Sequence, residues 1–131
     1  MDTQELYKRG LAVRKEIFGS EAVEKRMSAV GEFGKPLQHM INATAYGDIW
    51  SRPGLDNRIR SLVVLGMTAA LNRPAEFSVH AKGAVSNGCT PEEIREVLLL
   101  VALYCGIPAA NDAHRLAVEA LNLKSPAGRG A

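Results

Sequence analysis

The sequence predicts an all-α protein, folded as a single-domain bundle of about seven helices. Apolar residues recur at helical spacing in one segment after another, and glycine or proline stands at most of the joints between them. No segment alternates apolar and polar residues or contains the residue pairs of a hairpin turn. The chain has 131 residues, of which 47% are hydrophobic and 23% charged, so it can bury a core without disulfides. The domain is predicted to cover residues 1–124, followed by a disordered tail at residues 125–131.

Two helices are predicted at the N-terminus. Residues 4–18 place apolar side chains at loosely helical spacing, and Gly19 is predicted to end this helix. Ser20 belongs to the residue types that cap helices. It is therefore predicted to cap a second helix over residues 21–32.

A third helix is predicted after a break in the chain. Gly31, Gly34 and Pro36 interrupt the pattern, and residues 36–46 then place their apolar side chains on one side. The next stretch, GDIWSRPGLDN, is predicted to be irregular and to turn at its Pro-Gly pair.

Two more helices are predicted in the middle of the chain. Asp56 is placed to cap a helix that continues to Leu71 and has hardly any polar face. We therefore expect this helix to be buried on nearly all sides. Pro74 suits the first position of the following helix, which Gly88 is predicted to end.

The last two helices follow a strong start signal. Thr90 can cap a helix while Glu93 reaches back to it, which is the pattern of a capping box. Seven of the ten residues at 94–103 are strongly apolar, so this helix either lies at the centre of the fold or faces another subunit. A break at residues 106–108 precedes a final helix over residues 109–123.

Composition and charge exclude several classes of function. Sixteen Lys and Arg against fourteen Asp and Glu give a net charge of +2, and the basic residues are scattered, so neither nucleic acid nor a membrane is an expected partner. The longest apolar run, residues 97–108, is too short to span a membrane, and the N-terminus lacks a signal-peptide pattern. Cys89 and Cys105 lie far apart, which favours a reducing, cytoplasmic compartment. No residues have the spacing of a metal site, so no metal is expected.

Two polar residues on the helix predicted to begin at Pro74 could carry out acid–base chemistry. Glu76 and His80 are four positions apart, so both side chains project from one face. A carboxylate beside an imidazole fixes the tautomer of the ring and raises its basicity, as a general acid or base requires. A weak ion pair on the helix surface is the alternative, and it remains open.

Three arginines lie close together in the sequence, at Arg52, Arg58 and Arg60. Guanidinium groups bind carboxylates through paired hydrogen bonds, so a dianionic substrate could be held here. The alternative is that Arg58 and Arg60 are ordinary surface charges of a helix. Trp50 is the only tryptophan, and packing in the core is its default explanation.

Motifs along residues 7–121 carry a family resemblance. The most specific is GDIWSRPGL at residues 47–55, and the others are Tyr7-Lys8-Arg9-Gly10-Leu11, Arg60-Ser61-Leu62-Val63, Ala70-Leu71-Asn72-Arg73 with Glu76 and His80, Asn87-Gly88, and Tyr104-Cys105-Gly106-Ile107-Pro108. With these motifs the chain resembles the γ-carboxymuconolactone decarboxylases of the alkylhydroperoxidase-D-like superfamily.

The resemblance implies a compact all-α subunit that assembles into a ring, commonly a hexamer or a trimer. In the redox branch of the superfamily a CxxC precedes the histidine that His80 matches. Arg73 and Glu76 stand at those two cysteine positions here, so the activity of that branch is excluded. A thiol peroxidase of another kind would have to use Cys89 or Cys105.

The implied activity is the cofactor-independent decarboxylation of 4-carboxymuconolactone to 3-oxoadipate enol-lactone, in protocatechuate catabolism by the β-ketoadipate pathway. Arg60, with Arg52 as a second candidate, would bind a carboxylate or the lactone oxygen of this small carboxylated lactone. His80 would donate the proton, and Glu76 would orient His80. Trp50 would form a wall of the pocket and keep it dry.

The chain departs from the family pattern in two places. Close decarboxylases usually carry a proline and a His-Thr pair in the stretch filled here by residues 56–59, and a histidine where Arg115 stands. A related decarboxylase or isomerase for another carboxylated lactone or a β-keto acid is therefore an alternative. A non-catalytic protein that binds small acids is another.

Overall fold

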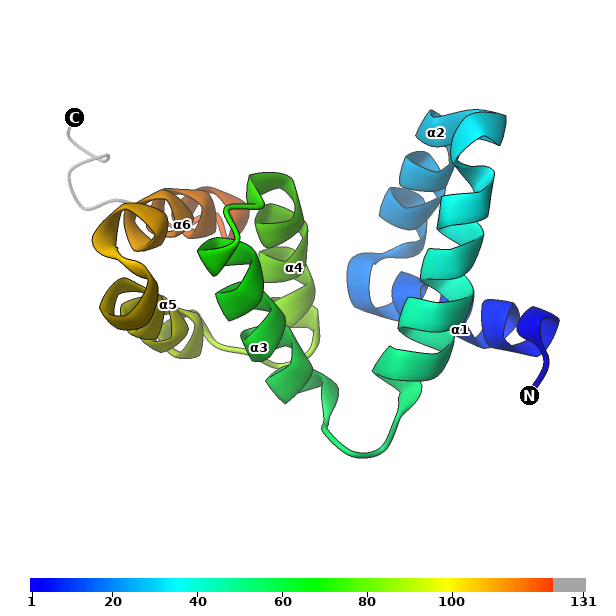
Figure 1. Ribbon diagram of the computed structural model, residues 1–131, viewed down its shortest axis with the longest axis horizontal. Helices are drawn as coiled ribbons and strands as arrows, with labels where there is room; N and C mark the ends of the chain where they lie inside the picture. Colours follow the sequence, from blue (N-terminus) through cyan, green and yellow to red (C-terminus); the bar gives the residue numbers. More distant parts are fainter. Residues whose placement is uncertain (124–131) are drawn as a thin grey trace. The chain divides into compact units, whose positions relative to one another are not determined.

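The computed structural model describes residues 1–123, and the regular structure of this part is entirely helical (Figure 1). This confirms the predicted fold class. The tail predicted at residues 125–131 lies outside the described residues. The chain forms two compact units, Met1–Asn57 and the residues from Arg58 onward. The single domain expected over residues 1–124 stays a prediction.

The first unit is built from two long helices and two shorter helical segments. The side chain of Asp2 caps the first helix by accepting a hydrogen bond from the N–H of Glu5 at 2.8 Å. The elements are α1 (Thr3–Phe18), α2 (Ser20–Met40), the π-helix η1 (Ile41–Asp48) and the 3₁₀ turn η2 (Ile49–Ser51).

Two local predictions for this unit are wrong. Ser20 does not cap α2 but is its first residue, because Gly19 at φ 93° makes the whole turn between α1 and α2. The chain is also not broken at Gly34 or Pro36. Only Gly31 leaves helical geometry, at φ 54° and ψ −152°. Pro36 lies in the second turn after this kink. Its missing N–H removes only one backbone hydrogen bond near the start of the resumed helix, so the helix continues through it.

The helix α1 packs against η1 so closely that the backbones of the two elements are in direct contact. A Cβ atom at Gly10 would lie 1.5 Å from the carbonyl oxygen of Asn42, and one at Gly47 would lie 2.2 Å from the carbonyl oxygen of Leu6. Only glycine allows so close an approach. The Arg9 guanidinium donates to the carbonyl oxygen of Gly47 at 2.5 and 2.8 Å, which fastens the same crossing.

The interior of the first unit is partly polar. Arg14 is buried and donates hydrogen bonds to the side-chain oxygens of Gln38 at 2.9 Å and Asn42 at 3.0 Å. The rings of Tyr46 and Trp50, both buried, stack with their centroids 5.6 Å apart. Buried hydrogen bonds and aromatic stacking therefore stabilise the interior of this unit together with apolar packing.

The second unit consists of four helices joined by short turns (Figure 1). Its elements are α3 (Asn57–Ala70), α4 (Pro74–Ser86), α5 (Pro91–Cys105) and α6 (Ile107–Ala120). The core is apolar and includes Leu65, Phe77, Ala81, Ile94, Leu98, Val101, Ala110 and Ala113. In the part of the chain that the structure describes, no helix combines the length and apolar character that crossing a membrane requires.

The start signals predicted for α4 and α5 are confirmed, whereas the break expected over residues 106–108 is limited to Gly106, because Pro108 fits the first turn of α6. Pro74 opens α4. Thr90 caps α5 by accepting from the N–H of Glu93 at 3.1 Å, while the Glu93 carboxylate accepts from the N–H of Thr90 at 3.0 Å. Gly106, at φ 104°, separates α5 from α6.

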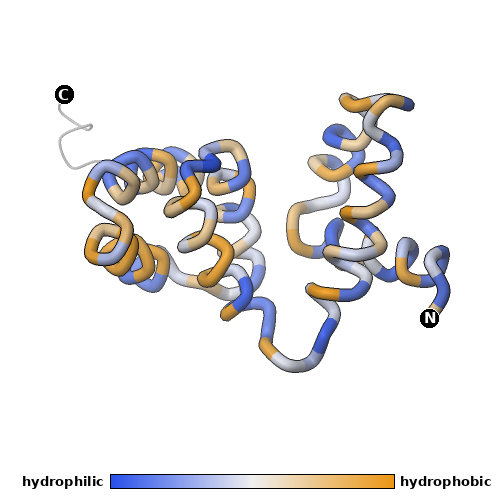
Figure 2. The backbone as a smooth tube through the Cα atoms, in the orientation of Figure 1, coloured by the Kyte–Doolittle hydropathy of each residue, from blue (hydrophilic) through white to orange (hydrophobic). Residues whose placement is uncertain are grey.

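Two apolar helices are more exposed in the single chain than their sequences suggest. In α3 only one face packs into the core, and Val63 and Met67 are exposed, so the expectation of burial on nearly all sides is wrong for this chain alone. Hydrophobic residues follow most of α5 (Figure 2). Leu100 and Leu103 on its outer face are nevertheless exposed, Leu103 by 72%. The inner face of this helix, with Ile94, Leu98 and Val101, lies in the core of the unit, and the contact of its outer face with another subunit stays a prediction.

Candidate active site

The predicted acid–base pair lies on α4. The Nε2 atom of His80 is 3.8 Å from Oε1 of Glu76, which is the range of an ion pair when the imidazole is protonated and is longer than a hydrogen bond. The His80 side chain is 11% exposed, whereas that of Glu76 is 54% exposed. Phe77 and Ala81 on the neighbouring face of α4 are in the core. His80 therefore lies at the edge of the core, beside the more exposed Glu76.

Arg60 lies near the start of α3, where it is half-buried. The side-chain amide of Asn87 donates a hydrogen bond of 2.9 Å to the hydroxyl of Ser61, which sets the register between the start of α3 and the end of α4. His80 precedes Asn87 by seven residues, so it lies roughly 10 Å along the helix axis from the level of Ser61. Arg60 is next to Ser61 in the chain, so its backbone lies near the C-terminal end of α4, about two helical turns beyond His80.

The other two arginines of the predicted cluster are engaged elsewhere. Arg58 forms an ion pair with Glu93, whose carboxylate also completes the capping box of α5. Arg52 pairs with Asp48 at 3.1 Å, four residues earlier in the chain. Arg58 and Arg52 therefore pair with carboxylates on different elements of the fold.

Trp50 and Arg52 belong to the first unit, whereas Arg60, Glu76 and His80 belong to the second. Trp50 is buried against Tyr46, which fits its default explanation of core packing. The roles expected of Trp50 and Arg52, a pocket wall and a carboxylate ligand, stay predictions.

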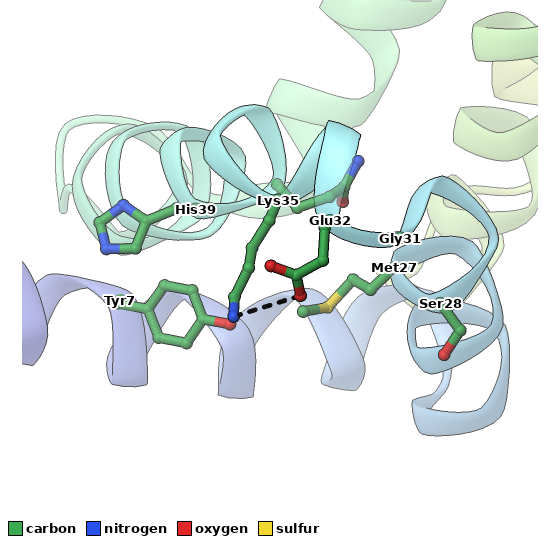
Figure 3. A pocket seen from close by; sticks show the side chains of 8 residues that line it. Tyr7, Met27, Ser28, Gly31, Glu32, Lys35 and His39 are labelled. Carbon is green, nitrogen blue, oxygen red and sulfur yellow. Dashed lines mark ion pairs between the residues drawn. The ribbon is translucent and has the colours of Figure 1, made fainter.

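A pocket of about 410 Å³ lies in the first unit, between α1 and the kinked α2 (Figure 3). Tyr7 stacks on His39 at one end, with ring centroids 5.0 Å apart, and Lys35 pairs with Glu32 at 3.7 Å. None of the predicted site residues lines this pocket. The paired charges of Lys35 and Glu32 also leave its wall without a net charge to select an anion.

Sequence reasoning missed the contact between Ser61 and Asn87. The Asn87-Gly88 pair was predicted only to end a helix. The backbone confirms this, since Gly88 adopts φ 94° just beyond α4. The partner of the Asn87 amide could not be found without the register between the helices. Within residues 1–123 no three His, Cys, Asp or Glu side chains are grouped as a metal site would require.

Comparison with known proteins gives concordant matches. Residues 35–119 match the model of the carboxymuconolactone decarboxylase family. The chain is 38% identical over 119 residues to a 4-carboxymuconolactone decarboxylase of Acinetobacter baylyi, and the alignment covers 91% of this chain and 89% of the relative. It is 39% identical over 117 residues to a nitrosuccinic acid decarboxylase of Metarhizium robertsii, and that alignment covers 89% of this chain and 82% of the relative.

This all-α chain matches the family model over residues 35–119 and a named member over most of its length, so it belongs to the carboxymuconolactone decarboxylase family. Both relatives are named decarboxylases. The chain is accordingly an enzyme of the carboxy-lyase class. The matched region begins within α2 and contains Arg60, Glu76 and His80.

Proposed function

We propose that this enzyme decarboxylates 4-carboxymuconolactone to 3-oxoadipate enol-lactone, without a metal or organic cofactor, in the cytoplasmic protocatechuate branch of the β-ketoadipate pathway. The observation that carries this proposal is the pair on α4, a nearly buried His80 with the half-exposed Glu76 at 3.8 Å. The relative from Acinetobacter baylyi named for this activity supports the choice of substrate.

The reaction asks little of the protein beyond binding and one proton. The substrate bears a carboxylate and a carboxymethyl group on the same carbon of an unsaturated lactone ring. When the bond to the carboxylate breaks, CO₂ leaves and the electron pair moves through the ring alkene onto the lactone carbonyl oxygen. The resulting dienolate takes up one proton on the carbon beside that carbonyl. Each turnover therefore releases one CO₂ and consumes one proton.

The three residues of the second unit divide these tasks. His80, as an imidazolium, donates the proton to the dienolate carbon. The Glu76 carboxylate stabilises the imidazolium and holds the ring orientation. Arg60 binds the carboxylate that survives, because a guanidinium can pair with both of its oxygens. The difference in level between Arg60 and His80 suits a substrate whose remaining carboxylate is several bonds from the reacting carbon.

A second candidate substrate is a nitro-substituted dicarboxylate, since the chain is as similar to the nitrosuccinic acid decarboxylase as to the lactone enzyme. Loss of CO₂ from the carbon that bears a nitro group leaves a nitronate, which also takes up a proton at carbon. Both substrates are dicarboxylates in which one carboxylate leaves beside an electron acceptor. The same roles for Arg60 and His80 would serve either.

The test is a comparison of the two substrates on the purified enzyme. 4-Carboxymuconolactone, generated in situ from β-carboxymuconate by its cycloisomerase, is followed by absorbance with CO₂ trapped in parallel. Nitrosuccinate is assayed by the same CO₂ trap. Rapid loss of the lactone with one equivalent of CO₂ supports the first candidate. CO₂ from nitrosuccinate alone supports the second, and CO₂ from neither above the spontaneous rates contradicts both.

The proposal includes assembly of identical subunits into a ring, a hexamer or a trimer, through the outer face of α5. Leucine side chains on the surface of a single chain are costly when they form a continuous patch. This face exposes Leu99, Leu100, Leu103, Tyr104 and, just beyond the helix, Ile107. Contact with another copy would bury it.

The substitution Leu103→Glu should dissociate this assembly. A carboxylate at the centre of an apolar contact would be buried without a partner, which is strongly unfavourable. Light scattering coupled to size-exclusion chromatography should show an oligomer for the native chain and a smaller species for the variant. Glu119→Ala, at an exposed position of α6 and outside this face, should leave the mass unchanged. A monomeric native chain, or a Leu103→Glu variant with native mass, would contradict the proposal.

A further inference from the structure

Three separate contacts join the start of α3 to the end of α4, the segment after it and the first turn of α5. The amide of Asn87 donates to the hydroxyl of Ser61 at 2.9 Å. The thiol of Cys89 donates to the carbonyl oxygen of Arg58 at 3.3 Å. The Arg58 guanidinium forms an ion pair with the carboxylate of Glu93. We refer to these five residues as the clamp.

The clamp joins groups that have little freedom of their own. Ser61 is 2% exposed and Cys89 is 5% exposed, so their hydrogen bonds are shielded from competing water. Glu93 is also held by the N–H of Thr90, which, together with the Arg58 guanidinium, keeps the pKa of this carboxyl below its usual range. Glu93 therefore remains an anion and a partner for Arg58 at neutral pH.

The clamp contacts lie on both sides of Arg60 in the sequence. Residues 58 and 61 are three apart and so share one face of α3, and a helical residue between them projects in a different direction. These contacts restrain rotation and sliding of the start of α3 against the end of α4. They therefore restrain the backbone from which the Arg60 side chain extends.

We propose that Ser61 and Asn87 are positioning residues for the decarboxylation, because their hydrogen bond places Arg60 where it meets the surviving carboxylate of a substrate whose reacting carbon lies at His80. This inference rests on the proposed roles of Arg60 and His80. It adds two residues that do not touch the substrate but determine how well a dicarboxylate is bound.

The expected effect is on substrate binding more than on the chemical step. The surviving carboxylate is present in both the substrate and the transition state, so a misplaced arginine weakens the binding of both about equally. Such a change raises KM and leaves kcat nearly unchanged. Loss of a positioning contact of this kind is expected to raise KM about tenfold.

The experiment compares Asn87→Ala and Ser61→Ala with the native enzyme, with Ser86→Ala as the matched control. Ser86 is the exposed residue next to Asn87, so this variant removes a hydroxyl from the same turn. KM and kcat are measured on 4-carboxymuconolactone, and the Kd of succinate, a dicarboxylate that does not react, is measured by calorimetry. Circular dichroism melts verify that each variant is folded. If either Asn87→Ala or Ser61→Ala fails to fold, the other variant still tests the inference.

A double-mutant cycle with Arg60→Ala shows whether Asn87 acts through Arg60. If it does, Asn87→Ala raises KM and the Kd of succinate about tenfold in the native background and has no further effect once Arg60 is alanine. Unchanged values in both clamp variants, or an equal further loss in the Arg60→Ala background, would overturn the inference while leaving the proposed function intact. If Arg60→Ala itself changes neither KM nor Kd, the proposed role of Arg60 is wrong, and the inference is wrong with it.

Discussion

Replacing His80 by alanine should lower kcat about 100-fold or more, with little change in KM. The loss follows because a positioned general acid contributes about 10² to 10⁴ in rate, and His80 is the donor proposed for the dienolate carbon. The measurement is steady-state turnover by lactone absorbance and trapped CO₂. Glu76→Gln, which keeps the shape of the side chain but removes its charge, should give a smaller loss of about tenfold, since the imidazole remains.

Lys82→Ala is the control for these variants. Lys82 is exposed on the same helix, two residues beyond His80, and its removal should leave kcat unchanged. If His80→Ala and Glu76→Gln each keep nearly full turnover, water supplies the proton. The two residues would then be the ordinary helix pair that their spacing alone allows.

Replacing Gly10 by alanine should destabilise the first unit by about 3 kcal/mol. The added Cβ would lie 1.5 Å from the carbonyl oxygen of Asn42 and 2.6 Å from the backbone nitrogen of Gly47, and neither backbone atom can turn away as a side chain could. α1 and η1 would have to separate, and the hydrogen bonds of Arg9 to Gly47 would be lost. A thermal melt should show a midpoint lower by about 10 °C.

Gly54→Ala is the matched control in the irregular segment that follows η2. A Cβ at Gly54 meets no atom within 4 Å, so this variant should stay within about 0.5 kcal/mol of the native chain. A Gly10→Ala variant that melts like the native chain would show that α1 and η1 do not pack as described.

The features predicted correctly from the sequence are those with local causes. The capping box at Thr90 and Glu93 depends on residues three apart, and the ends of α1 and α5 depend on single glycines that adopt positive φ. The approach of Glu76 to His80 is also local, because four residues of helix bring them together whatever surrounds them.

The features that escaped prediction depend on partners far along the chain. A helix was expected over residues 36–46, but helical geometry resumes directly after Gly31 and widens into a π-helix at Ile41, where α1 crosses it. No periodicity in the sequence encodes that widening. The hydrogen bond between Ser61 and Asn87 likewise needs the register of two helices, which spacing within one helix cannot supply.

The motif that most specifically indicated the family, GDIWSRPGL, turned out to have a structural use within its own unit. Gly47 admits the backbone of α1, and Trp50 stacks on Tyr46. A motif can therefore identify a family through the way its members pack, while the residues proposed for the chemistry, Glu76 and His80, lie elsewhere in the chain. This is why the family was easier to predict than the site.

The crossing of α1 and η1 has a consequence for genetics. A side chain that clashes with another side chain can be accommodated when a second mutation shortens its neighbour. At Gly10 and Gly47 the neighbour is main chain, which every amino acid possesses, so no second-site suppressor of this kind can exist. A selection for revertants of either substitution should therefore return the original glycine, and these two positions should be among the least free to drift during the divergence of the enzyme.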